Sequence, residues 1–341
     1  MIYFDSDYME CAHPLILERI GKINYDKNVA YSQDHYCKEA ADKIRKECAC
    51  PDAGVFYLPG GTQANATVID FLLRGYQGVI SAHTGHIHTH EAGAIEAYGH
   101  KILAIEGVDG KISAESVKAY LDLYRADTAM EHLVQPAMVY ISHPTEMGTL
   151  YSKAELTALS ELCRSEGLYL YMDGARMGYA LASESNDVSL ADVASLCDAF
   201  YIGGTKCGAL FSEAVVFPDP ALCRNFFTNI KRHGGVTAKG WLCGIQFDTL
   251  FTDGLYVDIC RNATRLAKKL RDGLVEKGYE LCSSSPANQV FVIFPDKVLA
   301  SLEGKASVCL WERHDAESCV VRLTTSWATE EAAVDEFLSL V

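Results

Sequence analysis

The 341-residue sequence has no block of lysine and arginine residues, few prolines, and no apolar run long enough to span a bilayer. Its 30 Lys and Arg residues are outnumbered by 45 Asp and Glu residues, so the formal net charge is -15 at pH 7. This charge argues against a nucleic-acid backbone or an anionic membrane surface as a partner. Small molecules or protein subunits are the expected partners.

The first residues also lack the basic start and apolar core of a signal peptide, so we expect synthesis and residence in the cytoplasm. The 13 cysteines are odd in number, and most lie inside apolar segments. Cys48 and Cys50 have one residue between them, which fits neither a zinc ribbon nor a thioredoxin-like site. Reduced, mostly buried thiols are therefore expected.

Short apolar runs alternate with amphipathic segments in the first two thirds of the chain. The amphipathic segments have helical periodicity, as at 64–73, 113–124 and 154–163. Strands that are apolar on both faces and alternate with helices predict an α/β fold, with a mostly parallel sheet covered by helices on both sides. In such sheets, functional residues collect in the loops after the strands. The apolar runs are 55–58, 79–81, 102–105, 138–141, 168–172, 199–202 and 214–217.

This pattern predicts three parts. Residues 1–35 form an irregular N-terminal arm, which is either a loose terminus or a segment that wraps a neighbouring subunit. Residues 36–250 form the large α/β domain, and 251–341 form a small C-terminal α+β domain. The elements expected outside the alternating region are helices at 34–48, 237–250, 255–277 and from Thr329, and strands at 279–281, 290–293 and 319–323.

A lysine follows the apolar run at 199–202, in the sequence Gly-Gly-Thr-Lys-Cys-Gly at 203–208. The glycines allow a tight bend and leave open space around Lys206. Partial desolvation there would lower the lysine pKa and favour the free amine that a Schiff base needs. An ordinary exposed turn lysine is the alternative interpretation of this stretch.

A second loop, Pro-Gly-Gly-Thr-Gln-Ala-Asn at 59–65, follows an apolar run and opens a helix. The amino end of a helix with a hydroxyl group suits a phosphate, so Gly60, Gly61 and Thr62 are candidate phosphate-binding residues. The loop is neither a Walker loop nor a dinucleotide fingerprint, and a simple turn is the alternative.

Four histidines lie in the loop His-Thr-Gly-His-Ile-His-Thr-His-Glu at 83–91. Their spacing matches no metal-ligand motif that we can name, although a metal-dependent hydrolase that uses this cluster stays open as an alternative. A flat imidazole at the end of a strand can instead stack on an aromatic cofactor and exchange a proton with substrate.

Two further segments carry charge next to apolar runs. In Met-Asp-Gly-Ala-Arg at 172–176, Asp173 either pairs with Arg176 or faces a cationic ligand atom, which leaves Arg176 for an anion. Arg322 lies inside the apolar stretch 320–323. It is either an outward-facing residue or a rigid bidentate clamp for a carboxylate.

One cofactor accounts for all of these loops. Pyridoxal phosphate (PLP) needs a phosphate cradle, a flat group over its ring, a carboxylate on the pyridine nitrogen and a Schiff-base lysine. All four occur here in loops after apolar strands, in chain order.

These motifs make the sequence resemble the low-specificity threonine aldolases, in the β-eliminating-lyase branch of the fold-type I PLP enzymes. The resemblance covers nearly the whole chain. It implies that Lys206 holds PLP with Thr205 beside it, that Asp173 pairs with the pyridine nitrogen, and that His86 stacks on the ring. It places the phosphate on Gly60, Gly61 and Thr62, and the substrate carboxylate on Ser6, Arg176 and Arg322.

The implied activity is cleavage of threonine, allo-threonine or a related β-hydroxy-α-amino acid to glycine and an aldehyde, with His86, directly or through water, as the expected base for the β-hydroxyl proton. A β-eliminating lyase, a racemase or an aminotransferase would use the same lysine and aspartate, so these reactions stay open, as does a catalytically silent family member. The resemblance also implies a dimer or tetramer with shared active sites.

The sequence departs from the family pattern at two places. At 141–148, where many members have an asparagine, His143 or Glu146 is expected to contact the cofactor ring or substrate. Near 234–239, many members offer an arginine to a neighbouring subunit's phosphate, and here Lys239, Arg232 or Lys231 would have to substitute.

Overall fold

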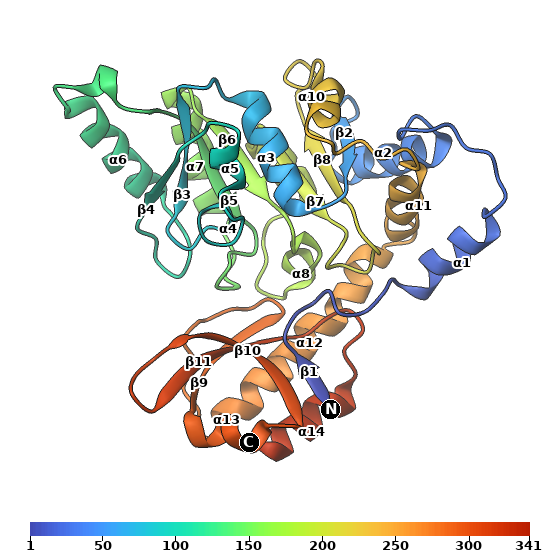
Figure 1. The fold of residues 1–341 in the computed structure, drawn as a ribbon, viewed down its shortest axis with the longest axis vertical. Helices are drawn as coiled ribbons and strands as arrows, with labels where there is room; N and C mark the ends of the chain where they lie inside the picture. Colours follow the sequence, from blue (N-terminus) through green and yellow to red (C-terminus); the bar gives the residue numbers. More distant parts are fainter.

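The computed structural model describes residues 1–341, and its largest element is a seven-stranded sheet with the strand order β2-β8-β7-β6-β5-β3-β4 (Figure 1). Neighbouring strands from β7 through β6, β5 and β3 to β4 are parallel, whereas β8 runs antiparallel to both β7 and β2. The expected mostly parallel sheet is confirmed. The strands are β2 (Gly54–Leu58), β3 (Gln77–Ala82), β4 (Ile102–Ile105), β5 (Gln135–Ser142), β6 (Tyr169–Asp173), β7 (Ala199–Gly203) and β8 (Glu213–Phe217).

Helices cover both faces of this sheet. Neighbouring residues of one strand therefore belong to different apolar clusters, one on each face. Met138 and Tyr171 belong to one buried cluster, whereas Val139 and Met172 belong to another. Strands buried on both faces read as continuous apolar runs, which is why they were visible in the sequence. The helices here are α2 (His35–Glu47), α3 (Gly61–Leu72), α4 (His86–Thr89), α5 (Ala94–Ala97), α6 (Ala114–Ala126), α7 (Lys153–Glu166), α8 (Met177–Ala182), α9 (Leu190–Leu196), α10 (Phe226–Arg232) and α11 (Trp241–Leu250), with a short 3₁₀ turn at Met130–His132.

A smaller sheet with the order β1-β10-β11-β9 lies below the large one in Figure 1. It packs against α12, which reaches down from the large sheet, and against α14. The elements are β1 (Ile2–Phe4), α12 (Leu255–Glu276), β9 (Gln289–Pro295), α13 (Asp296–Leu302), β10 (Ala306–Arg313), β11 (Ser318–Thr324) and α14 (Glu331–Leu340). Both chain ends lie in this part (Figure 1).

Three features differ from the sequence expectations. The arm at 1–35 is only partly irregular, because β1 pairs in parallel with β10 and a helix, α1 (Pro14–Lys22), projects from the body (Figure 1). The expected strand at 279–281 is reduced to a single bridge between Leu281 and Val292. Strand β10 was not predicted, because it is half-exposed and ends in the charged pair Glu312 and Arg313.

None of the helices combines the length and the apolar character that crossing a membrane requires. All 13 cysteines are free thiols, and most are buried.

The carboxyl ends of β3, β5, β6 and β7 point toward the smaller sheet, and the short helices α4 and α8 follow two of them (Figure 1). The loops that carry the predicted site residues therefore gather at one edge of the large sheet.

Candidate active site

A cavity of about 300 Å³ opens at this edge, a size at the lower end of the range for small-molecule sites. Of the residues that match the family pattern and were expected at the cofactor or substrate, all line the cavity except Ser6 and Arg322. The lining residues are Tyr8, Pro59, Gly60, Gly61, Thr62, His86, Ser142, Pro144, Thr145, Glu146, Asp173, Ala175, Arg176, Tyr201, Thr205, Lys206 and Glu213.

Lys206 enters the cavity from the turn after β7. Its Nζ makes no hydrogen bond or ion pair and lies 5.9 Å from the centre of the Tyr8 ring. Burial, together with the positive charge of Arg176, lowers the lysine pKa below its usual value. A desolvated amine without a partner is the group that forms a covalent link with a carbonyl compound.

Asp173 ends β6 and is buried. Oδ2 accepts hydrogen bonds from Tyr140 Oη at 2.7 Å and Asn65 Nδ2 at 2.9 Å, while Oδ1 accepts one from Tyr201 Oη. Burial alone would raise the pKa of this carboxyl, but the charge of His86 and these hydrogen bonds lower it. Asp173 is thus an ionised carboxylate, and no ion pair joins it to Arg176.

The amino end of α3 is open toward the same cavity. Gly60 is the residue before the helix, and no side chain caps the free N–H groups of the first turn. A Cβ on Gly60 would meet no atom within 4 Å, whereas a Cβ on Gly61 would lie 2.9 Å from Tyr201 Oη. Free N–H groups, the helix dipole and open space form an anion cradle.

A buried carboxylate fixes the orientation of His86. Its Nδ1 lies 2.9 Å from Glu91 Oε1, and the same oxygen accepts a hydrogen bond from Asn65 Nδ2 at 2.8 Å. Because a carboxylate only accepts, Nδ1 carries the proton and Nε2 is left without a partner in the protein. Burial opposes the imidazolium, but Glu91 and Asp173 outweigh it and raise the pKa of His86.

The other histidines of this loop do not converge. His83 lies 3.4 Å from Glu106, and His90 stacks between His86 and Trp311. No group of three or more His, Cys, Asp or Glu side chains has a geometry that could hold a metal ion.

Arg176 is held by Asp7. Its Nε donates to Asp7 Oδ2 at 2.7 Å and its Nη2 donates to Oδ1 at 3.0 Å. Of the first residues, Asp7 thus fixes Arg176 and Tyr8 lines the cavity, whereas Ser6 makes no side-chain contact there.

Arg322 does not line the cavity, but it lies close enough to Arg176 for the two charges to interact. Its guanidinium sits 5.1 Å from the centre of the Trp311 ring, and its buried Nε has no hydrogen-bond partner. Burial and the charge of Arg176 lower the pKa of Arg322. This guanidinium therefore has no carboxylate partner, in contrast to Arg176.

At the two departures from the family pattern, the structure separates the candidates. Glu146 lines the cavity, whereas His143 is buried behind it and accepts a hydrogen bond from Tyr151 N through Nδ1. Burial lowers the pKa of His143 to about 4. The basic residues at 231–239 do not line the cavity: Arg232 pairs with Asp70, and Lys231 lies over the ring of Tyr31.

Sequence reasoning gave no role to several residues of the site. Glu213 accepts hydrogen bonds from Gly204 N at 2.9 Å and Thr205 Oγ1 at 2.7 Å, so it fixes the turn that carries Lys206. Burial raises its pKa to about 7. A single carboxylate at the edge of the apolar run 214–217 was the available signal. Tyr8 and Tyr201 carried no such signal, because tyrosines are frequent in this chain.

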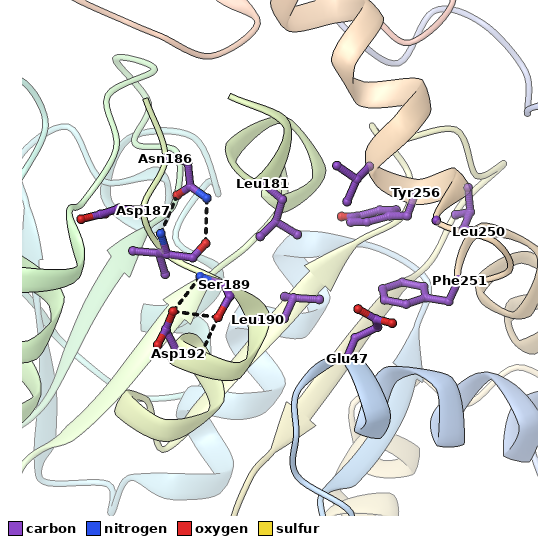
Figure 2. Close-up of a pocket in the computed structure, with 13 residues that line it drawn as sticks. Glu47, Leu181, Asn186, Asp187, Ser189, Leu190, Asp192, Leu250, Phe251 and Tyr256 are labelled. Atoms are coloured by element: carbon purple, nitrogen blue, oxygen red, sulfur yellow. Dashed lines mark hydrogen bonds between the residues drawn. The ribbon is translucent and has the colours of Figure 1, made fainter. Parts of the chain in front are cut away.

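A second cavity, of about 470 Å³, lies apart from these residues (Figure 2). Apolar side chains such as Leu181, Leu190 and Tyr256 line it together with the acidic residues Glu47 and Asp192. No lysine, arginine or histidine lines this second cavity, so it offers neither an amine nor a cation for an anionic ligand.

Comparison with known proteins gives consistent matches along the whole chain. A family model described as Beta-eliminating lyase matches residues 4–317. A low specificity L-threonine aldolase from a Pseudomonas species is 31% identical over 98% of this chain and 95% of its own. A second protein of that name, from Pseudomonas aeruginosa, is 28% identical over 89% of this chain and 87% of its own.

Solved structures agree. A Leishmania major threonine aldolase is 40% identical and superposes with a TM-score of 0.97 over 100% of this chain and 98% of its own. An aspartate aminotransferase from Thermus thermophilus is 18% identical, with a TM-score of 0.74 over 100% of this chain and 90% of its own. The latter likeness concerns the fold alone, and it confirms the expected fold-type I architecture.

Proposed function

The chain belongs to the β-eliminating lyase family, and on this premise we propose that it is a PLP-dependent aldolase. Its reaction is the cleavage of the Cα–Cβ bond of threonine, allo-threonine or a related β-hydroxy-α-amino acid to glycine and an aldehyde. The observation that supports this most directly is one cavity that contains an unpaired lysine, an ionised aspartate and an open helix amino end.

The residues of the cavity fit PLP. The open space beside Gly60 and the free N–H groups of α3 suit its phosphate. Asp173 suits a protonated pyridine nitrogen, because its hydrogen bonds keep it negative even though it is buried. Lys206 Nζ has no competing partner and is free for covalent attachment.

PLP, when bound, supplies an electron sink for the pair released as a bond to Cα breaks. The chain's residues determine which bond that is. Lys206 would hold the cofactor, and His86, whose Nε2 has no partner in the protein, would cover its ring and could hold a proton at Nε2. Thr205 is tied to Glu213, which keeps the lysine turn in place.

The substrate carboxylate is proposed to bind between Arg176 and Arg322, and Ser6, the residue before Asp7, is proposed as a further contact. Arg322 has an unsatisfied buried Nε, and its position over Trp311 restrains the plane of the guanidinium. A carboxylate fixed at this point sets the orientation of the bonds at Cα, and orientation is a large part of the rate in such reactions.

Product analysis tests this function. Purified protein with bound PLP should convert L-threonine or L-allo-threonine into equal amounts of glycine and acetaldehyde, and the Lys206→Ala variant should not. A 2-oxo acid plus ammonia would indicate β-elimination, and a keto acid formed only with an amino acceptor would indicate transamination. Either result would replace the aldolase proposal.

We further propose that the enzyme is a dimer or tetramer that works in the cytoplasm. Several large apolar side chains of the first 31 residues are exposed, and a second copy of the chain would cover them. The free, mostly buried cysteines fit a reducing compartment. Light scattering on the purified protein tests the assembly. The exposed side chains are Met1, Tyr3, Tyr8, Met9, Leu15, Leu17, Tyr25, Val29 and Tyr31.

A further inference from the structure

Glu146 brings a second carboxyl group to the cavity that holds Lys206 and His86. It lies in the loop between β5 and α7 and lines the cavity together with Ser142 of the same segment. Asp173 has a set of donors that keeps it ionised, and Glu213 is tied to the lysine turn. Glu146 neither has such a set of donors nor accepts a hydrogen bond from the lysine turn.

The two oxygens of Glu146 have different surroundings. Oε1 accepts hydrogen bonds from Ser142 Oγ at 2.6 Å and from the backbone N–H of His86 at 2.9 Å. Oε2 makes no hydrogen bond, and it is not among the buried polar atoms that lack a partner. One oxygen therefore anchors the group, and the other is a free acceptor beside open space.

His86 is less suited to accept a proton. Glu91 binds its Nδ1, and the nearby carboxylates of Glu91 and Asp173 favour the protonated imidazolium, which has no free lone pair. The pKa of Glu146 is raised as well, but from the much lower ordinary value of a carboxyl group. Burial and the charge of Asp173 make its carboxylate a stronger base than an exposed one, although the Ser142 hydrogen bond reduces the effect.

We propose that Glu146 accepts the proton of the substrate's β-hydroxyl group through Oε2, while Ser142 and the His86 backbone hold Oε1. This inference rests on the proposed aldolase function. It moves to Glu146 the proton-accepting role that the sequence suggested for His86, and it leaves His86 over the cofactor ring.

The step balances. The O–H bond of the substrate breaks and its proton goes to Oε2, while the O–H electron pair becomes the second bond of the aldehyde C=O. The Cα–Cβ bond breaks and its pair stays on Cα, which takes up one proton to become the methylene of glycine. Glu146 returns to the carboxylate when it passes its proton on, so no proton is consumed overall.

The test uses Glu146→Gln, which keeps an oxygen for the Ser142 and His86 donors but presents an amide at the free position. Cleavage of L-threonine should fall about 100-fold or more, the usual range for loss of a general base. Exchange of the α-protons of glycine with D₂O needs no β-hydroxyl acceptor and should stay near the wild-type rate. Glu161→Gln, an exposed change on α7, is the matched control and should leave both rates unchanged.

Substrate binding gives a readout that does not depend on turnover. Rapid mixing gives dissociation constants, before cleavage, for L-threonine and for 2-aminobutyrate, which lacks the hydroxyl group. The wild type should bind threonine more tightly than 2-aminobutyrate. In Glu146→Gln the ratio of the two dissociation constants should fall about tenfold, because the site no longer offers a carboxylate to the hydroxyl group.

The outcomes separate this inference from the proposed function. Wild-type protein that cleaves no β-hydroxy amino acid overturns both. Wild-type cleavage with an equally active Glu146→Gln overturns the role of Glu146, and so does a parallel loss of cleavage and glycine exchange, which would indicate a structural role. If His86→Phe alone abolishes cleavage while Glu146→Gln is active, His86 is the acceptor.

Discussion

Asp7 and Arg176, 169 positions apart in the sequence, form a bidentate ion pair with distances of 2.7 and 3.0 Å. Asp7 is fully buried, and Asn288 also donates to it at 2.9 Å. The pair connects the segment after β1 to the loop after β6, and it fixes an arginine at the edge of the cavity. Asp7 is thus both a link between the two sheets and a support for the site.

Loss of this pair should destabilise the protein. Asp7→Asn leaves a buried guanidinium without its counter-ion, which typically costs about 3–5 kcal/mol. Burial alone would raise the pKa of Asp7, but Arg176 and Lys206 lower it below its usual 3.8. The stabilisation is therefore present above this usual pKa of 3.8 and is lost as the pH falls through the lower folded-state pKa.

Urea unfolding at neutral and acidic pH measures this effect. The difference between wild type and Asp7→Asn should shrink as the medium becomes acidic. Asp258→Asn, which removes an exposed partner of Arg261, should change the free energy of unfolding by less than about 1 kcal/mol. A difference for Asp7→Asn as small as this control would mean that the buried pair is not a major support.

Arg322 should determine substrate affinity and leave cofactor binding unaffected. Arg322→Lys keeps the charge but loses the planar, bidentate donor set, so KM for threonine should rise about tenfold or more. The absorbance of bound PLP should not change. Arg313→Lys, on the neighbouring strand and paired with Asp296 at the surface, is the control. An unchanged KM in Arg322→Lys would remove this residue from the carboxylate site.

Alanine substitutions at the two glycines that begin α3 should have different effects on stability and on PLP binding. A methyl group on Gly60 meets no protein atom, so Gly60→Ala should leave the melting temperature of the apoprotein unchanged and weaken PLP binding by occupying the ligand's space. A methyl group on Gly61 would lie 2.9 Å from Tyr201 Oη, so Gly61→Ala should lower both the melting temperature of the apoprotein and its affinity for PLP. Equal PLP affinity in Gly60→Ala and wild type would place the phosphate elsewhere.

Glu91 should control the protonation of His86. Burial lowers the pKa of His86, and the Glu91 hydrogen bond is the largest of the causes that raise it, ahead of the charges of Asp173 and Glu91, so Glu91→Gln should lower that pKa. NMR titration of the apoprotein follows the imidazole directly. Glu106→Gln, beside the half-exposed His83, should leave the His86 titration in place. A His86 pKa that does not move in Glu91→Gln would contradict the assignment.

Most of the large sheet was predictable from the sequence. Runs such as 138–141 and 199–202 are buried on both faces, so no polar alternation interrupts them. Strand β10 was not predictable in this way, because none of its eight side chains is fully buried and three are exposed. Strand β1 is three residues long, and only its pairing with β10 makes it a strand.

The loops of the site were predictable, but several contacts were not. Glycines and a lysine after a strand give a local signal, which is why Lys206 and Gly60 could be singled out. The pairing of Arg176 with Asp7 depends on the docking of distant segments, and no local pattern encodes it. Glu146 appeared only as a departure from the family pattern, and its orientation became visible only beside His86.

Borohydride reduction of the PLP-loaded protein, followed by peptide mass mapping, tests most directly whether Lys206 carries the cofactor in this cavity. Reduction should bleach the visible absorbance and leave a pyridoxyl phosphate adduct on the peptide that contains Lys206, and Lys206→Ala should show neither the absorbance nor the adduct. An adduct on another lysine, or none after PLP has been added, would contradict the assignment of Lys206 and with it the proposed chemistry.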